Sequence, residues 1–344
     1  MSDLSEAYRD YPVHLQHIIP LDFHTVDSVP ESHEWPHSDC LKAVIDEISI
    51  PVIDLMDPSA EKLVGHASEN WGIFQVTNHG VPLSMLMDVE CEARRLFLLP
   101  IEEKLKVLRS PEGATGYGAA RISPFFSKFM WHEGFTIIGS SSLDHAKELW
   151  PHEHKRFCDV IDEYQKKMKE LAHKLLLLIL KSLEISEEDI TSCAASACES
   201  NGAGALQFNS YPCCPNPSRA IGLAPHTDSL LLTILNQTQD SSALQIFRDG
   251  VGWIPVDPVR DALVVNVGDL LHILSNGKFP SVYHRVIVSE KHRISVAYFY
   301  GPRTDSQVAP LSRIEVPIYR SLSVKEFISI KAKHLEKALS FIRI

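Results

Sequence analysis

Helical spacing of apolar side chains dominates the first half of the chain. It recurs in three segments, residues 58–69, 84–98 and 155–183, each long enough to form a helix with one buried face. The first segment begins at Pro58, since proline is tolerated in the first turn of a helix. A shorter helix is expected after Pro100, and strand-like runs stand at residues 50–55 and 71–81. The pattern predicts a mostly helical N-terminal half.

From residue 205 onward, short runs of β-branched and apolar residues alternate with Gly, Pro, Asn and Asp. The runs cover residues 205–211, 221–223, 230–236, 243–247, 252–256, 262–268, 270–275, 285–289 and 293–300. About nine strands at near-regular spacing are typical of a β-sandwich or jelly roll. The helical pattern returns at residues 322–344.

These patterns divide the chain into four parts. We expect a mainly β protein with flanking helices: a double-stranded β-helix (jelly-roll) core, a helical N-terminal half and a C-terminal helix. The expected boundaries are an irregular arm over residues 1–47, a mostly helical region over 48–200, the core over 201–305 and a helical segment over 306–344. Residues 112–143 are rich in Gly, Ser and aromatic side chains with little periodicity, which predicts a long functional loop.

Charge and cysteine content exclude several classes of protein. The net charge is −11, from 33 basic and 44 acidic residues without a basic block, so nucleic acid is not an expected partner. The seven cysteines form no CxxC pair, which argues against a disulfide framework or a structural zinc site and fits a reducing compartment. The longest aliphatic run, residues 175–180, is far shorter than the ~20 residues of a membrane span. We expect a cytoplasmic protein with no membrane partner; the sequence leaves the oligomeric state open.

Candidate metal ligands stand in the β region. Residues i and i+2 of a strand share a face, so His226 and Asp228 aim at one point and Thr227 faces away. His284, at the start of a later strand, is a candidate third ligand, with His272 and His292 as rivals on spacing alone. Two histidines and one carboxylate leave three coordination positions open, which is typical of non-haem Fe(II) oxygenases.

Two further strands carry polar side chains suited to a carboxylate. Arg293 and Ser295 share one face of an otherwise apolar strand, and a buried arginine there needs a counter-ion. Asn209 and Tyr211 also share a face and can add hydrogen-bond donors near the metal. The charges of Fe(II), Asp228, Arg293 and a dicarboxylic 2-oxo acid cancel, as a buried site favours. The arrangement predicts 2-oxoglutarate, with its far carboxylate on Arg293, Ser295 and Tyr211.

The chain resembles the plant 2-oxoglutarate/Fe(II)-dependent dioxygenases from about residue 50 to about residue 339. The resemblance rests on the iron and Arg-x-Ser motifs and on the blocks at residues 50–55, 71–80, 209–215 and 266–277. It implies that Fe(II) is the cofactor, 2-oxoglutarate and O₂ are co-substrates, ascorbate is the reductant, and succinate and CO₂ are released. His226, Asp228 and His284 match the iron ligands of that family.

A second resemblance concerns the substrate. Residues 116–137, residues 149–151 and the start of the chain are similar to the gibberellin 3-beta-dioxygenases, which implies 3-beta-hydroxylation of gibberellin precursors to bioactive hormone. A gibberellin is a rigid, mostly apolar polycycle with a carboxylate, so its pocket should be apolar with a cation at one end. Arg121 is the candidate cation, with Lys128 as rival, and Phe125 and Trp131 are candidate walls of the pocket.

Other functions remain open on the sequence. A sister oxygenase acting at another gibberellin carbon, or on a flavonoid-type substrate, would share the iron ligands. An oxygenase that uses no 2-oxoglutarate is disfavoured by Arg293 and Ser295. A jelly-roll hormone-binding protein needs no open iron coordination, and a zinc hydrolase would leave Arg293 without a purpose.

Overall fold

The computed structural model describes residues 4–40, 48–139, 141–183, 185–190, 204–238, 242–311 and 316–344. Its α-helices are α1 (Leu4–Tyr8), α2 (His37–Cys40), α3 (Ala60–Asn70), α4 (Leu83–Phe97), α5 (Ile101–Leu105), α6 (Ser142–Leu149), α7 (His154–Lys181), α9 (Asp269–Leu274) and α10 (Val324–His334). Short 3-10 helices are η1 (Leu15–His17), η2 (Glu31–His33), η3 (Ser123–Phe125), η4 (Pro217–Arg219) and η5 (Leu335–Phe341).

The strands form two principal sheets. They are β1 (Val52–Asp54), β2 (Ile73–Thr77), β3 (Gly116–Gly118), β4 (Glu133–Ile138), β5 (Ala205–Tyr211), β6 (Ile221–His226), β7 (Leu232–Gln237), β8 (Leu244–Arg248), β9 (Gly252–Pro255), β10 (Leu263–Val267), β11 (His284–Ile287), β12 (Arg293–Tyr300), β13 (Gln307–Val308) and β14 (Leu322–Ser323). The larger sheet has the order β1-β2-β10-β7-β12-β5-β4-β3, the smaller β6-β11-β8-β9, and β13 pairs with β14. The expected jelly-roll core with flanking helices is confirmed.

Alternation along the strands gives the larger sheet one face against helices and one against a cavity. On β12, Ile294 and Val296 belong to the apolar core shared with α7, whereas Arg293 and Ser295 line the cavity between the sheets. Successive side chains of a strand point to opposite faces, so both environments follow from one sequence. Both polar residues at the start of β12, Arg293 and Ser295, therefore stand on its cavity face.

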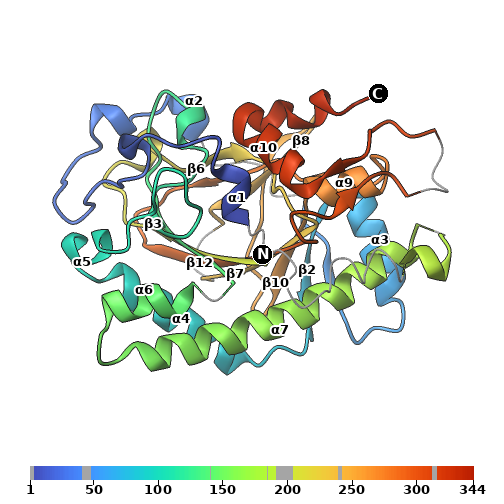
Figure 1. Cartoon of the computed structure of the whole chain (residues 1–344), viewed down its shortest axis with the longest axis horizontal. Helices are drawn as coiled ribbons and strands as arrows, with labels where there is room; N and C mark the ends of the chain where they lie inside the picture. Colours follow the sequence, from blue (N-terminus) through green and yellow to red (C-terminus); the bar gives the residue numbers. More distant parts are fainter. Residues whose placement is uncertain are drawn as a thin grey trace.

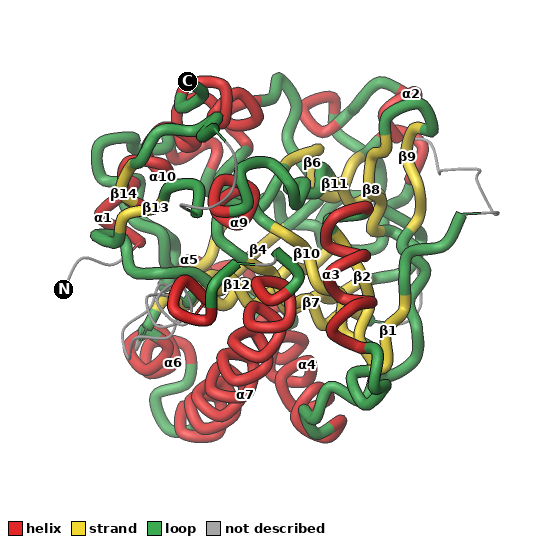
Figure 2. Tube along the Cα trace, turned by 90° about the vertical axis from the view of Figure 1, so that its right-hand side faces the viewer, coloured by secondary structure: helices red, strands yellow, loops and turns green. Residues whose placement is uncertain are grey.

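The long helix α7 supports the larger sheet from outside. Its apolar stripe includes Ile161, Tyr164 and Met168, all buried, as the helical spacing of residues 155–183 predicts. Figure 1 shows α7 along the lower edge of the molecule, and Figure 2 shows α4, α6 and α7 together on one side of the larger sheet. This helical layer backs the strands that carry the candidate site.

One predicted strand is wrong. The sequence predicts a strand over residues 270–275, but residues 270–274 lie in the short helix α9 and Ser275 is its C-cap. Leu270, Leu271, Ile273 and Leu274 are all buried. A short apolar run that is buried all round has no period that separates helix from strand.

The predicted loop over residues 112–143 is also partly wrong. It contains β3 and β4, and β4 pairs along its length with β5 in the larger sheet. β4 begins with a charged residue, Glu133, which interrupts the apolar pattern that would indicate a strand. Glu133 is buried, and its carboxylate is paired with the Lys104 ammonium at 2.7 Å.

The N-terminal arm closes one end of the cavity. Within residues 4–40 the arm has only short helical turns, and α1 packs against α10 near the opposite end of the chain. Residues 41–47 and 191–203, which include two of the predicted boundaries, lie outside the described residues. The four-part division of the chain stays a prediction.

Candidate active site

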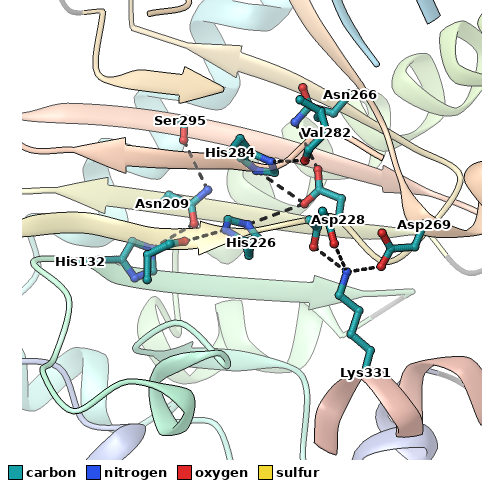
Figure 3. Close-up of polar contacts among 12 residues, drawn as sticks. His132, Asn209, His226, Asp228, Asn266, Asp269, Val282, His284, Ser295 and Lys331 are labelled. Atoms are coloured by element: carbon teal, nitrogen blue, oxygen red, sulfur yellow. Dashed lines mark hydrogen bonds and ion pairs between the residues drawn. The ribbon is translucent and has the colours of Figure 1, made fainter. Parts of the chain in front are cut away.

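Paired strands of the smaller sheet bring the three predicted metal ligands together. His226 ends β6 and His284 begins β11, and these two residues face each other across the antiparallel pair. Asp228 follows β6 by two residues. The ligand atoms of His226, Asp228 and His284 all lie within 4.8 Å of one another, and Figure 3 shows the three side chains converging on one point.

Backbone carbonyls fix the orientation of both imidazoles. The Nδ1 of His226 lies 2.9 Å from the Ala224 carbonyl oxygen, and the Nδ1 of His284 lies 3.1 Å from that of Val282. A carbonyl only accepts, so each Nδ1 donates and each Nε2 keeps its lone pair. Each Nε2 is 3.9 Å from Asp228 Oδ1. This is the orientation that metal-ligating histidines need.

Electrostatics favours neutral imidazole beside an ionised carboxylate. Burial, together with the adjacent His284 ring, lowers the pKa of His226 to about 3. Burial alone would raise the pKa of Asp228, but the adjacent His284 and His226 and the hydrogen bond from the Asn266 amide bring it below its ordinary value. Neutral His226 and ionised Asp228 are the forms that bind a divalent cation.

The two rival histidines are engaged elsewhere. His272 uses both ring nitrogens, Nδ1 at 2.8 Å from the Phe279 carbonyl oxygen and Nε2 at 2.9 Å from the Tyr319 hydroxyl. The Nε2 of His292 lies 2.9 Å from the Ser210 hydroxyl. Within the described ranges, only His226, Asp228 and His284 form a cluster able to hold a metal.

A lysine from the C-terminal helix supports the loop between the two motif residues. The buried Lys331 ammonium donates to the Thr227 carbonyl oxygen at 2.7 Å and to its hydroxyl at 2.8 Å, and it pairs with the Asp269 carboxylate (Figure 3). The Asp269 amide donates to the Asp228 carbonyl oxygen at 2.8 Å. Sequence reasoning missed Lys331, because its partners lie about 60 and 100 residues away along the chain and a lysine on a helix is most often exposed.

Glycine makes this close approach possible. A Cβ at Gly268 would lie 2.2 Å from the Leu230 carbonyl oxygen, which is shorter than any real contact. The residue before Asp269 must therefore lack a side chain for the loop after Asp228 to pack here.

The predicted carboxylate site assembles on β5 and β12. Strand register places Arg293 opposite Tyr211 and Ser295 opposite Asn209. The Arg293 guanidinium lies 5.0 Å from the centroid of the Tyr211 ring, and the Asn209 amide donates to the Ser295 hydroxyl at 3.4 Å. The sequence prediction that these four residues lie together agrees with their placement.

The Arg293 guanidinium is buried with unmatched donors. One terminal nitrogen donates to Gln237 Oε1 at 2.6 Å, but Nε and the other terminal nitrogen have no partner. A buried cation with free donors is costly unless an anion completes it. Sequence reasoning missed Gln237, which lies at the end of β7 and faces β12.

One cavity of about 670 Å³ joins these features. Its volume falls within the ~300–1,000 Å³ typical of small-ligand sites. The inner faces of both sheets form its floor, with the iron-ligand candidates and Arg293 among the lining residues. Segments distant in the sequence form its remaining walls: the arm around Tyr8, the loop from Arg109 to Phe125, and α10.

The predicted substrate residues fall into two groups. Arg121 and Phe125 line the cavity. Lys128 and Trp131 are not among the lining residues: the Lys128 ammonium donates to the Glu31 carbonyl oxygen at 2.8 Å, and Trp131 is 1% exposed with its indole N–H on the Pro212 carbonyl oxygen. Lys128 and Trp131 therefore have structural contacts in place of the predicted substrate contacts.

Some lining residues that the sequence did not single out carry unpaired polar atoms, among them Arg109, through Nε, and His132, through Nδ1. His132 also contacts Asn209, with Nε2 3.0 Å from the amide oxygen. Their sequence neighbourhood is irregular, so no spacing signal identified them.

Similar proteins agree with this geometry. Residues 203–302 match the 2OG-Fe(II) oxygenase superfamily, and residues 50–154 match the N-terminal region of a non-haem dioxygenase in morphine synthesis. The chain is 50% identical to gibberellin 3-beta-dioxygenase 1 of Pisum sativum, with 100% of this chain and 94% of the relative covered. It is 48% identical to gibberellin 3-beta-dioxygenase 1 of Arabidopsis thaliana, with 99% and 98% covered.

Solved structures give the same fold. A crystal structure of JOX2 in complex with 2OG, Fe and JA has a TM-score of 0.77 at 31% identity, covering 88% of this chain and 89% of that one. A dioxygenase for auxin oxidation in rice has a TM-score of 0.69 at 23% identity, covering 86% and 100%. The second likeness bears on the fold alone.

Proposed function

The chain belongs to the gibberellin 3-beta-dioxygenase family within the 2OG-Fe(II) oxygenase superfamily, and from this premise we propose that it adds a 3-beta hydroxyl group to gibberellin precursors. 2-Oxoglutarate and O₂ are consumed, and succinate and CO₂ are released. The observation that carries the proposal is one cavity that contains a metal-ligand triad, a buried guanidinium with free donors and room for a polycyclic substrate.

We assign Fe(II) to His226, Asp228 and His284. The donor set fits the ion, because two neutral imidazoles with free Nε2 atoms and one carboxylate leave three coordination positions open. Fe(II) bound there would supply the activation of O₂ that a C–H hydroxylation requires. The chain's own part is to hold these three side chains in place, through the carbonyls of Ala224 and Val282.

We assign the far carboxylate of 2-oxoglutarate to Arg293, with Ser295, Tyr211 and Asn209 beside it. The support is the pair of unmatched Arg293 donors, which a carboxylate can accept in the bidentate way that arginine favours. The anion would also balance the buried charge of Arg293. Ascorbate serves as the reductant that keeps the iron ferrous.

We assign the remaining space of the cavity to the gibberellin. Phe125 and the aliphatic side chains of Leu223, Leu235 and Val286 line it, which suits an apolar polycycle. Arg121 lines the same space and is a candidate for the charged end of the substrate.

Rival functions lack a supporting observation of this kind. A zinc hydrolase would leave the two free Arg293 donors without a ligand, and a hormone-binding protein would have no use for the open coordination positions of the triad. A sister oxygenase acting at another gibberellin carbon would share every residue assigned above, so the position of the new hydroxyl group must be measured.

The test is product analysis by mass spectrometry. The full chain is incubated with Fe(II), 2-oxoglutarate, ascorbate and a panel of gibberellin precursors. One oxygen added at the 3-beta position, with one succinate for each product, is the expected result. Oxygen at another carbon would move the enzyme to a sister class. Succinate without altered gibberellin would point to another substrate, and iron binding without succinate would point to a binding protein.

We also propose a cytoplasmic location and retain the four-part division of the chain. The described cysteines, Cys40, Cys91, Cys158, Cys213 and Cys214, are free thiols, which fits a reducing compartment. Among the described residues, no helix has the length and apolarity to cross a membrane. Cys193 and Cys198 lie outside the described residues.

A further inference from the structure

Arg109 is a buried arginine that faces the cavity away from the strands of the iron site. It is 5% exposed and follows α5 in a segment bridged to β3. Its amide donates to the Tyr117 carbonyl oxygen at 2.8 Å, and its guanidinium donates to the Ala119 carbonyl oxygen at 2.8 Å. Both ends of the side chain are therefore anchored, while Nε has no partner.

A glycine in β3 allows this segment to lie so close. Gly116 has a φ of +106°, and a Cβ there would lie 2.5 Å from the Val107 carbonyl oxygen. Only glycine tolerates both conditions without strain. The backbone that carries Arg109 is thus packed tightly against β3, and the position of its guanidinium is set by the fold.

A second arginine, Arg121, lies beside Arg109 but is already engaged. It donates to the carbonyl oxygens of Gly113, at 2.5 Å, and Tyr11, at 3.2 Å. Its guanidinium carbon lies 3.9 Å from the centroid of the Tyr8 ring. Arg121 therefore ties the loop to the N-terminal arm, whereas Arg109 has a buried donor, Nε, without a partner.

The two arginines form a positive region without a carboxylate partner. Burial and the charge of Arg121 lower the pKa of Arg109 to about 10, so it stays charged at neutral pH. In the described part of the chain, neither arginine makes an ion pair, although the exposed Asp10 also lines the cavity. A buried cation, Arg109, next to the half-buried Arg121 creates a positive potential that an anion would relieve.

This region is distinct from the Arg293 site but borders it. His132 stands between them: its Nε2 contacts Asn209, and its pKa is lowered by burial and, in part, by the charge of Arg109. The cavity thus has a guanidinium with an unmatched donor at each of two places, on β12 and on the loop after α5. The far carboxylate of 2-oxoglutarate can accept from only one of these two guanidinium groups.

We propose that Arg109 binds the carboxylate of the substrate, with Arg121 as a positioning residue that holds Tyr8 and the arm over it. The inference rests on the proposed function, because it takes a gibberellin as the carboxylate-bearing ligand. A planar guanidinium fork matches a carboxylate in two hydrogen bonds. It also replaces the expectation that Arg121 contacts the carboxylate, since both terminal nitrogens of Arg121 already donate to backbone carbonyls.

The test compares a gibberellin acid with its methyl ester on the wild-type chain and on Arg109→Gln. The ester keeps the polycycle and removes the charge. In the wild type, KM for the acid should be roughly 10- to 100-fold lower than KM for the ester, the range expected for a charged hydrogen bond. In Arg109→Gln that preference should disappear, while KM for 2-oxoglutarate stays unchanged. Lys128→Gln, outside the cavity, is the matched control and should keep the preference.

The acid-to-ester ratio within one variant does not depend on how much of the protein is folded. If Arg109→Gln is unstable, Arg109→Lys keeps a cation and should retain part of the preference. An unchanged ratio in Arg109→Gln would overturn the inference while leaving the proposed function intact. Failure of the wild type to hydroxylate any gibberellin would instead overturn the proposed function.

Discussion

The two ends of the cavity are built in different ways. The iron and 2-oxoglutarate end stands on paired strands, where register places His226 against His284 and Arg293 against Tyr211. The end that we propose for the substrate is assembled from the arm, the loop after α5 and α10, which meet only in the folded chain. A sheet holds the side chains of a reaction site in fixed positions. Connecting segments can change in sequence without disturbing the sheet. The strand-built end therefore carries the residues for the reaction, and the other end carries the residues for substrate specificity.

The largest expected effect is the loss of turnover when a ligand at the strand-built end is removed. Asp228→Ala removes the charged ligand of the triad, so turnover should fall below detection in a succinate-release assay. Binding of the gibberellin acid should survive, because the other end of the cavity is untouched. Asp159→Ala, an exposed carboxylate on α7, is the control. Full activity of Asp228→Ala would refute the assignment of the ligands.

The next effect concerns Lys331, which lies on α10 and contacts the loop beside the metal-ligand candidates. Lys331→Met leaves the Asp269 carboxylate buried without its partner, which should cost about 3–5 kcal/mol in the free energy of unfolding. Urea unfolding of the metal-free chain measures it. Asp269→Asn in the same chain should recover part of the loss, since it removes the uncompensated charge. A loss below about 1 kcal/mol would contradict the argument that Lys331 is needed to compensate the buried Asp269 carboxylate.

A smaller effect separates the two carboxylate sites. Arg293→Leu should raise KM for 2-oxoglutarate roughly 10- to 100-fold, the range for a lost charge-assisted hydrogen bond. Tyr211→Phe removes a single hydroxyl and should raise it only about 5- to 10-fold. Initial rates of succinate formation at varied 2-oxoglutarate measure both. Equal KM values for Arg293→Leu and the wild type would contradict the assignment.

The sequence predicted the strand-built end of the cavity better than the other end, because strand alternation can be recognised in a sequence. Alternation in a strand revealed His226 with Asp228 and Arg293 with Ser295, because residues two apart share a face. No such rule connects Arg109 to Tyr8 or Lys331 to Thr227, since tertiary packing alone brings them together. For the same reason β4 escaped prediction: its buried Glu133 is acceptable only because Lys104 and the Tyr117 hydroxyl lie 2.7 Å away.

The last effect concerns the pH dependence of folding and not turnover. Burial lowers the pKa of His33, His132 and His292 to about 4. The unfolded chain binds these protons near pH 6.5 and the folded chain only near pH 4, so stability held above about pH 6.5 is lost as the pH falls toward 4. Urea unfolding of the metal-free chain at pH 7, 6 and 5 should show this decline. His132→Gln should make it shallower; an identical decline would contradict the burial argument.

The central claim is that one cavity holds two carboxylates at separate arginines. The most direct measurement is a crossed set of KM values for 2-oxoglutarate and for the gibberellin acid, in Arg293→Leu and Arg109→Gln. The account predicts that Arg293→Leu raises only KM for 2-oxoglutarate and that Arg109→Gln raises only KM for the gibberellin. If either variant raised both values equally, the two sites would not be separate and the account would fail.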